Sequence, residues 1–63
     1  MGRYEFPDTF EPFGAWTPEH AAARVYGGKA GDYIVTGPHD RVRRYITVYR
    51  VTGGFVGDIY LAD

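Results

Sequence analysis

The chain has 63 residues, a formal net charge of −1 and no cysteine, which leaves room for one small core and excludes stabilisation by disulfides. Area scalings for a chain of this size give roughly 4,100 Å² of folded surface, with roughly 60% of the unfolded surface buried. A core this small supplies little stability by itself. We therefore expect stability to come from the six tyrosines, four phenylalanines and one tryptophan, or from a partner subunit.

The residue types that are missing exclude several kinds of chemistry. The chain has no serine, asparagine, glutamine or cysteine, so it has no N-glycosylation site and lacks the two commonest nucleophiles. His39 and Asp40 could act as part of a catalytic triad only with such a nucleophile, and His20 and His39 alone do not predict a metal site. We therefore expect no enzymatic activity, no cofactor and no bound metal.

Composition also favours a location and an origin. No apolar run approaches the about 18 residues needed to span a membrane, and residues 1–7 lack the apolar core of a signal peptide. These features predict a cytoplasmic protein that does not interact with membranes. Six arginines against one lysine, with many alanines, glycines, valines and aspartates, are typical of a GC-rich bacterial or phage genome.

Residues 1–16 form an N-terminal arm that is rich in aromatic residues and interrupted by prolines. Glu11-Pro12-Phe13-Gly14 has proline at the second position and glycine at the fourth, as in a type I turn. Tyr4–Phe6 has the composition of a short edge strand, which would add a fourth strand to the sheet.

Residues 17–27 carry the signals of a short helix. Thr17 suits the N-cap, Pro18 suits the first helical position, and Gly27-Gly28 ends the helix. Trp16 and Ala21 have the spacing of a hydrophobic staple. A helix this short must pack on another element, and the face that we expect it to bury consists of Ala22, Val25 and Tyr26.

Residues 31–63 change to the period of antiparallel strands. Asp32–Thr36 is a β-branched run that ends at a predicted turn, Gly37–Asp40. A second strand is predicted at Val42–Thr52 and a third at Phe55–Leu61. The Gly53-Gly54 pair between them predicts a two-residue hairpin.

That hairpin sets a register in which Thr52 faces Phe55 and Val48 faces Ile59. One side of the ribbon then collects the predicted core residues Ile46, Val48, Phe55, Ile59 and Leu61. The opposite side collects Tyr45, Thr47, Tyr49, Val51, Val56, Asp58 and Tyr60. Two arginines fall on the apolar side: Arg50 would lie opposite Gly57, and Arg44 would need a bulge or a place at the sheet margin.

These elements predict a single α+β domain over residues 1–63. One short helix would pack on an antiparallel sheet of three strands, or four with the arm. A small SH3-like β-barrel with the helix as an insertion is the alternative architecture.

Charge is distributed unevenly along the chain. Residues 1–20 hold one arginine against four carboxylates, whereas residues 21–50 hold six cations against two carboxylates. Arg41, Arg43 and Arg44, close to Tyr45 and Tyr49, are the ingredients of a sheet that binds single-stranded nucleic acid. A net charge of −1 disfavours that function, because nucleic-acid-binding domains usually carry a basic balance.

The tyrosine side of the ribbon predicts a protein-binding site. Arg43, Tyr45, Tyr49 and Tyr60 have the composition of interface hot spots. The aromatic residues of the arm could instead fold over this side as a second small core, or a homodimer could cover it across a two-fold axis. We expect a non-enzymatic protein-binding module, such as a bacterial or phage regulator or inhibitor of a larger protein, with a nucleic-acid-binding module as the alternative.

Overall fold

The computed structural model describes residues 1–62, which form one helix, one 3-10 turn and five strands. The elements are β1 (Gly2–Glu5), β2 (Pro12–Ala15), α1 (Pro18–Tyr26), η1 (Ala30–Asp32), β3 (Tyr33–His39), β4 (Tyr45–Arg50) and β5 (Phe55–Leu61). All strand pairs are antiparallel, in the order β2-β1-β5-β4-β3. The α+β class is confirmed, but the sheet has five strands and is open, with β2 and β3 at its edges, so it is not a barrel.

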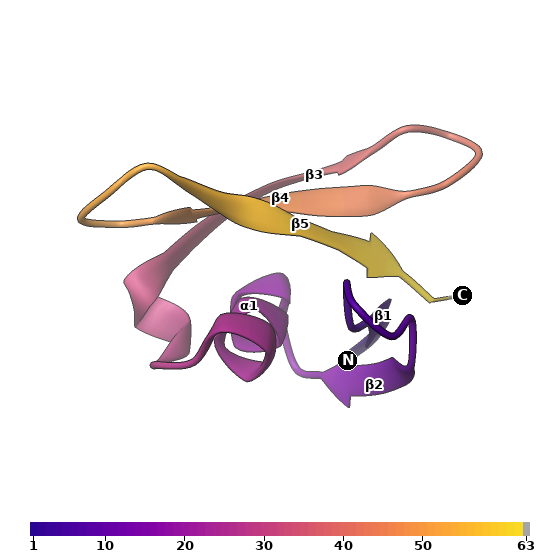
Figure 1. Ribbon diagram of the computed structural model, residues 1–63, viewed down its shortest axis with the longest axis horizontal. Coiled ribbons are helices and arrows are strands. Elements are labelled where there is room, and N and C mark those ends of the chain that lie inside the picture. The colour runs from indigo at the N-terminus through magenta and orange to yellow at the C-terminus, as the bar shows by residue number, and fades with distance from the viewer. Residues whose placement is uncertain (63) are drawn as a thin grey trace.

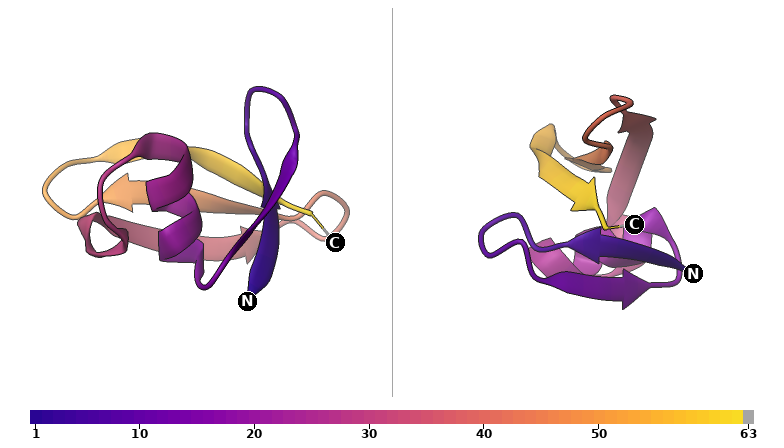
Figure 2. Two further views of the ribbon diagram at one scale, coloured as in Figure 1. Left: turned by 90° about the horizontal axis from the view of Figure 1, so that it is seen from below. Right: turned by 90° about the vertical axis from the view of Figure 1, so that its right-hand side faces the viewer.

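The helix and the β1–β2 hairpin lie on the same side of β3, β4 and β5 (Figures 1 and 2). We call the side of β3–β5 that faces α1 the inner face and the opposite side the outer face. Within residues 1–62, no helix or strand covers the outer face (Figure 1). No helix in this part of the chain has the length and apolar character needed to cross a bilayer.

The N-terminal arm folds into a hairpin. The predicted strand at Tyr4–Phe6 corresponds to β1, which pairs with β5 on one side and with β2 on the other. The predicted turn at Glu11–Gly14 is wrong, because Pro12–Ala15 is strand β2. Pro12 begins an edge strand, a position where a missing N–H costs no ladder hydrogen bond. The sheet therefore gains two strands from the arm rather than one.

The helix has the predicted caps. The Thr17 hydroxyl accepts a hydrogen bond from the His20 N–H at 3.2 Å, and Gly27, at φ 89°, donates its N–H to the Ala23 carbonyl at 2.8 Å. The predicted staple is wrong, because the Trp16 side chain is 75% exposed. The buried side of the helix consists of Ala21 and Ala22, with Ala23, Val25 and Tyr26 partly buried.

The core lies between α1, the β1–β2 hairpin and the inner face. Val48 and Ile59 are fully buried there, and Ile46 is nearly so. The remaining core residues are Tyr4, Phe13, Ala15, Ala21, Ala22 and Tyr33. The Tyr33 hydroxyl donates to the Gly27 carbonyl and so fixes the end of α1 to β3. The accessible surface is 4152 Å², close to the area expected for this length.

The turn between β4 and β5 differs from the predicted two-residue hairpin. Residues 51–54 form a four-residue loop, in which the Arg50 N–H donates to the Gly54 carbonyl and the Gly53 N–H donates to the Arg50 carbonyl. The register is shifted by two residues, so that Ile46 lies opposite Ile59. Because side chains alternate with a period of two, this shift leaves both isoleucines on the inner face.

A bulge at Val56 changes the faces at the start of β5. Val48 lies opposite Gly57 and Tyr49 lies opposite Phe55, which leaves Val56 as the extra residue. The predicted places of Phe55 and Val56 are therefore wrong. Phe55 is 63% exposed, whereas Val56 packs against the core.

The ends of β3 and β4 also differ from prediction. β3 continues through the predicted turn as far as His39, and β4 starts only at Tyr45, which leaves Val42 exposed in the connecting loop. Arg44 directly precedes β4, at the sheet margin. The predicted pairing of Arg50 with Gly57 is wrong, because Gly57 on β5 lies opposite Val48. On its other side Arg50 lies opposite Tyr33 of β3, and its guanidinium carbon is 5.2 Å from the centroid of the Tyr33 ring.

Candidate functional site

The three tyrosines predicted as a binding site share the outer face. Tyr45 and Tyr60 are opposite each other on β4 and β5, and Tyr49 is four residues further along β4. They alternate with the buried Ile46, Val48 and Ile59, so the outward position of each tyrosine follows from the strand period. All three side chains are half-buried.

Tyr60 lies at the centre of the first aromatic cluster on this face. Its ring makes an edge contact with Tyr45, with centroids 6.1 Å apart at 70°, and lies 6.3 Å from the ring of Phe10. His39 extends the cluster to β3, because its ring lies 5.2 Å from that of Tyr45. We call Phe10, His39, Tyr45 and Tyr60 the first aromatic cluster.

The loop between β1 and β2 holds Phe10 in an unusual conformation. Phe10 has φ 60°, a left-handed value that a bulky aromatic residue rarely adopts. Two backbone hydrogen bonds fix the loop: the Phe10 N–H donates to the Phe6 carbonyl, and the Phe6 N–H donates to the Glu11 carbonyl. Such a conformation persists only where surrounding contacts impose it. Here it places the Phe10 ring beside Tyr60.

Arg43 connects the outer face to the arm. Its guanidinium carbon lies 4.4 Å from the centroid of the Tyr60 ring, a cation–π distance. The same guanidinium forms an ion pair with Glu5, which lies opposite Tyr60 in the β1–β5 pairing. The structure therefore places Arg43 with Tyr60 as predicted, and gives it two internal partners.

A second apolar cluster lies at the other end of the outer face. The rings of Tyr49 and Phe55 meet edge to face, with centroids 6.1 Å apart. Ile34 lies opposite Tyr49 on β3 and is 51% exposed. We call Ile34, Tyr49 and Phe55 the second apolar cluster. It lies about 13 Å along β4 from the first, given the rise of about 3.3 Å per residue.

The arm does not close over the outer face as a second core. Of its aromatic side chains, only Phe10 reaches that side. Phe6 and Phe13 pack against each other, with ring centroids 4.5 Å apart, and Phe13 and Tyr4 belong to the inner core. The two clusters on the outer face therefore remain accessible, separated by a polar row of Thr36, Thr47 and Asp58.

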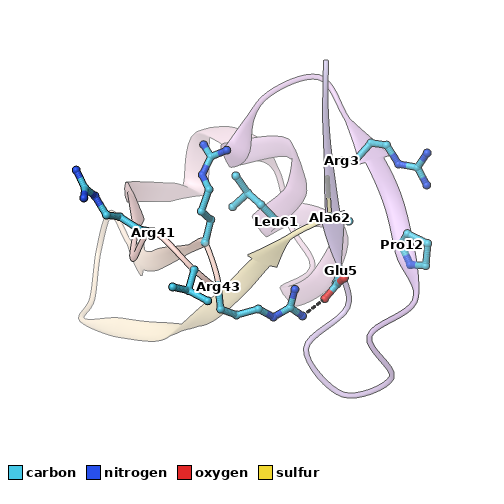
Figure 3. A pocket seen from close by; sticks show the side chains of 9 residues that line it. Arg3, Glu5, Pro12, Arg41, Arg43, Leu61 and Ala62 are labelled. Carbon is cyan, nitrogen blue, oxygen red and sulfur yellow. Dashed lines mark hydrogen bonds and ion pairs between the residues drawn. The ribbon is translucent and has the colours of Figure 1, made fainter.

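The arginines proposed for nucleic-acid binding line one groove beside this face, but Arg41 points away from Arg43, whose side chain is directed at Glu5 (Figure 3). The groove has a volume of about 560 Å³ and lies between the β3–β4 loop, the hairpin of the arm and the end of β5 (Figure 3). Its lining contains Arg41, Arg43 and Arg44, and also Arg3, which the sequence pattern did not predict for this site. Arg3 lies in a segment with a negative local charge, so its sequence neighbours give no sign of this grouping.

Backbone hydrogen bonds position the sides of the groove. At the end of β5, the Leu61 N–H donates to the Arg44 carbonyl and the Ala62 N–H donates to the Arg3 carbonyl, each at 3.0 Å. In the β3–β4 loop, one Asp40 carboxylate oxygen accepts from the N–H groups of Arg41 and Val42, at 2.6 and 3.1 Å. This Asx turn orders the loop that carries the arginines.

Two tyrosines have raised pKa values, and both belong to the packed interior. Burial, and then the Glu19 charge, raise the pKa of Tyr4 above its ordinary value of 10.0. Burial, and then the charge of Asp58 and the neighbouring Tyr33, raise the pKa of Tyr26, whose hydroxyl donates to the Asp58 carbonyl at 3.3 Å. Both phenols are therefore protonated at neutral pH. Within residues 1–62, no three potential metal ligands group together.

Comparison with known proteins finds no matching family model, no matching curated protein and no matching solved structure. Function therefore has to follow from the geometry and chemistry of the two surfaces, which meet at Arg43.

Proposed function

We propose that this chain is a non-enzymatic protein-binding module whose outer face binds a partner with apolar side chains and nearby carboxylates. The observation that carries the proposal is the pair of exposed clusters on a sheet face that no element of residues 1–62 covers. An exposed apolar patch of this kind, with a polar row across it, is typical of interaction surfaces. The partner would place two apolar anchors about 13 Å apart, one on each cluster.

Charge at one end of the face favours an acidic partner. Arg41, Arg43 and Arg44 line the groove beside the first aromatic cluster, together with Arg3, and among the described residues that line it Glu5 is the only one with a carboxylate. Opposite charges across an interface speed association and exclude wrong partners. A regulator or inhibitor that binds an acidic surface of a larger protein fits this arrangement.

The display of random peptides would test this proposal without knowledge of the natural partner. A library is selected on the wild-type chain and each selected peptide is then titrated against the wild type and the Tyr45→Ala/Tyr49→Ala double variant. We expect selected peptides to combine aromatic or aliphatic residues with Asp and Glu, and to bind the variant at least about tenfold more weakly, as for hot-spot tyrosines.

Thr47→Ala provides the matched control, because it shortens a side chain of the same face between the two tyrosines. It should keep the affinity of the wild type, and circular dichroism should show that all variants are folded. Peptides that bind the double variant and the wild type equally would contradict the proposal, as would a selection that enriches no apolar residues. A mass twice that of the chain in light scattering would identify a second copy as the occupant instead.

Binding of single-stranded nucleic acid is the second candidate, and the contact between Arg43 and Tyr60 is the observation that favours it. The same contact limits it, because the guanidinium occupies a face of the ring on which a base would stack. Titration with a fluorescent oligothymidylate at several salt concentrations tests it. Submillimolar binding with a clear salt slope would support this function, and its absence at low salt would exclude it.

A further inference from the structure

Strand β3 leaves one edge of the sheet open. It is the last strand in the order β2-β1-β5-β4-β3, and seen from the helix side it runs along the margin of the sheet (Figure 2). The other edge strand, β2, has four residues and begins with Pro12. In β3, by contrast, the first four residues, Tyr33–Thr36, include no proline and no charged side chain. Edge strands without such protection pair readily with another extended chain.

The hydrogen bonds of β3 show which of its backbone groups face this edge. The Val51 N–H donates to the Asp32 carbonyl at 2.9 Å, so the backbone of Asp32 is directed toward β4. Because this direction alternates along an antiparallel strand, Ile34 also bonds toward β4, whereas Tyr33 and Val35 face the open edge. The Tyr33 N–H is already used within η1. In the described part of the chain, the groups left for an added strand are therefore the Tyr33 carbonyl and both backbone groups of Val35.

The side chains of the outer face specify which strand would fit. Two rows of side chains cross β5, β4 and β3 and end at this edge: an apolar row of Phe55, Tyr49 and Ile34, and a polar row of Asp58, Thr47 and Thr36. A strand added antiparallel to β3 would extend both rows, since facing side chains lie about 4.5–5.5 Å apart. It would need an apolar residue beside Ile34 and, two positions earlier, a polar residue beside Thr36.

We propose that β3 binds an extended segment of the partner protein as a further antiparallel strand of the sheet. This inference rests on the proposed function, and it names the conformation in which the partner reaches the second apolar cluster. The partner residue opposite Val35 exchanges two backbone hydrogen bonds with it, and the next residue of the partner packs on Ile34.

A second copy of this chain fits the edge less well than an unrelated strand does. A two-fold pairing centred on Val35 bonds both valines, but it places Ile34 opposite Thr36 of the other copy. A pairing centred on Ile34 joins the two apolar rows, but it sets each Val35 opposite a Tyr33 whose N–H is already used. Either register satisfies the backbone or the apolar row, whereas an unrelated strand can satisfy both.

Nuclear magnetic resonance titration with a designed peptide tests the pairing. The probe is acetyl-Glu-Thr-Val-Phe-Thr-Lys-amide, whose valine would lie opposite Val35 and whose phenylalanine would lie beside Ile34. It is added to the ¹⁵N-labelled chain. We expect saturable shifts along β3, and at saturation the Val35 N–H should exchange with solvent at least about tenfold more slowly than in the free chain.

Two N-methylated peptides and two variants of the chain provide matched controls. A methyl group on the valine nitrogen removes the hydrogen bond to the Val35 carbonyl and should weaken binding at least about tenfold. The same group on the phenylalanine nitrogen, which points away from β3, should change the affinity less than about threefold. Ile34→Ala should weaken binding about threefold or more. Val42→Ala truncates an exposed apolar side chain outside β3 and should leave the affinity unchanged.

Three results would overturn the proposal. They are equal effects of the two N-methyl groups, unchanged exchange of the Val35 N–H at saturation, and the lack of saturable shifts at millimolar peptide. A free chain with a slowly exchanging Val35 N–H and twice the expected mass in light scattering would assign the edge to a second copy, which also overturns it. None of these measurements uses the selected peptides or the Tyr45→Ala/Tyr49→Ala variant, so failure here leaves the proposed function standing, and the two can fail separately.

Discussion

The two faces of strands β3–β5 have similar side chains and different surroundings. On the inner face, Val48 and Ile59 are fully buried beneath the helix and the arm. On the outer face, Ile34 and Phe55 are more than half exposed, although both are as apolar as the core residues. The comparison shows that apolar character alone does not make a core in this protein. What decides it is which side the helix and the arm cover, and no element of residues 1–62 covers the outer face.

The largest expected effect on stability comes from truncating an isoleucine of the inner face, compared with the same substitution on the outer face. Ile59→Ala should reduce the free energy of unfolding by about 3 kcal/mol, because it opens a cavity in a packed interior. For a domain of this size, that loss approaches the whole stability. Ile34→Ala on the outer face is the matched control and should cost less than about 1 kcal/mol, since its side chain is half exposed already. Urea denaturation measures both, and similar losses would show that the outer face is also core.

A smaller loss of stability should follow from adding a side chain at the position where β5 lies closest to the helix. A Cβ at Gly57 would lie 2.2 Å from the Tyr26 hydroxyl oxygen, so Gly57→Ala should displace that ring and cost about 2 kcal/mol. Gly54→Ala is the control, because its Cβ would meet nothing within 4 Å.

Tyr26→Phe, which removes the hydroxyl, should recover part of that loss in the Gly57→Ala background. A double-mutant cycle measured by urea denaturation gives the coupling. Strict additivity of the two substitutions would show that the Tyr26 hydroxyl does not limit the space at residue 57.

On the outer face, electrostatics should matter much less for stability. Glu5→Gln removes the partner of Arg43, whose side chain is 48% exposed, so we expect a loss of about 0.5 kcal/mol. Added salt should reduce the difference from the wild type. Glu11→Gln, in the adjoining β1–β2 loop, is the control and should have no effect, because Glu11 forms no ion pair within residues 1–62. A loss above about 2 kcal/mol would mean that the pair acts as a buried one.

The smallest expected effect is a pH dependence of stability that appears only at alkaline pH. It comes from the raised pKa values of Tyr4 and Tyr26. Folding raises the pKa of Tyr4 and Tyr26, so above pH 10 the unfolded chain releases these protons more readily than the folded one. Their contribution is fully present below that pH and is lost as the pH rises through the folded values. Stability measured between about pH 9 and 11 should fall less steeply in Tyr4→Phe/Tyr26→Phe than in the wild type. Parallel slopes would contradict this assignment.

The candidate site was partly predictable, because strand alternation is local. Along the strands, side chains alternate between the two faces of the sheet. Burial of Ile46, Val48 and Ile59 in the core therefore places Tyr45, Tyr49 and Tyr60 on the opposite face. An error of two residues in the register left that alternation intact. The bulge at Val56 did not follow from the pattern, and it moved Phe55 to the outer face. The arm's aromatic residues were expected over this side as a group, whereas Phe10 is the one that contacts Tyr60. Arg3 was not predicted, because the other residues of its groove lie far away in the chain.

By itself, the sequence determined the α+β class, the helix with its Thr17 cap and Gly27 end, and the side of β4 that is buried. Each of these depends on a repeat or a cap within a few residues. The tertiary structure alone decided that the arm pairs with β5 as a hairpin, that no element of residues 1–62 covers the outer face, and that Arg3 lines the same groove as Arg41 and Arg43. These features arise from contacts between distant segments, whose selection depends on how the whole core packs.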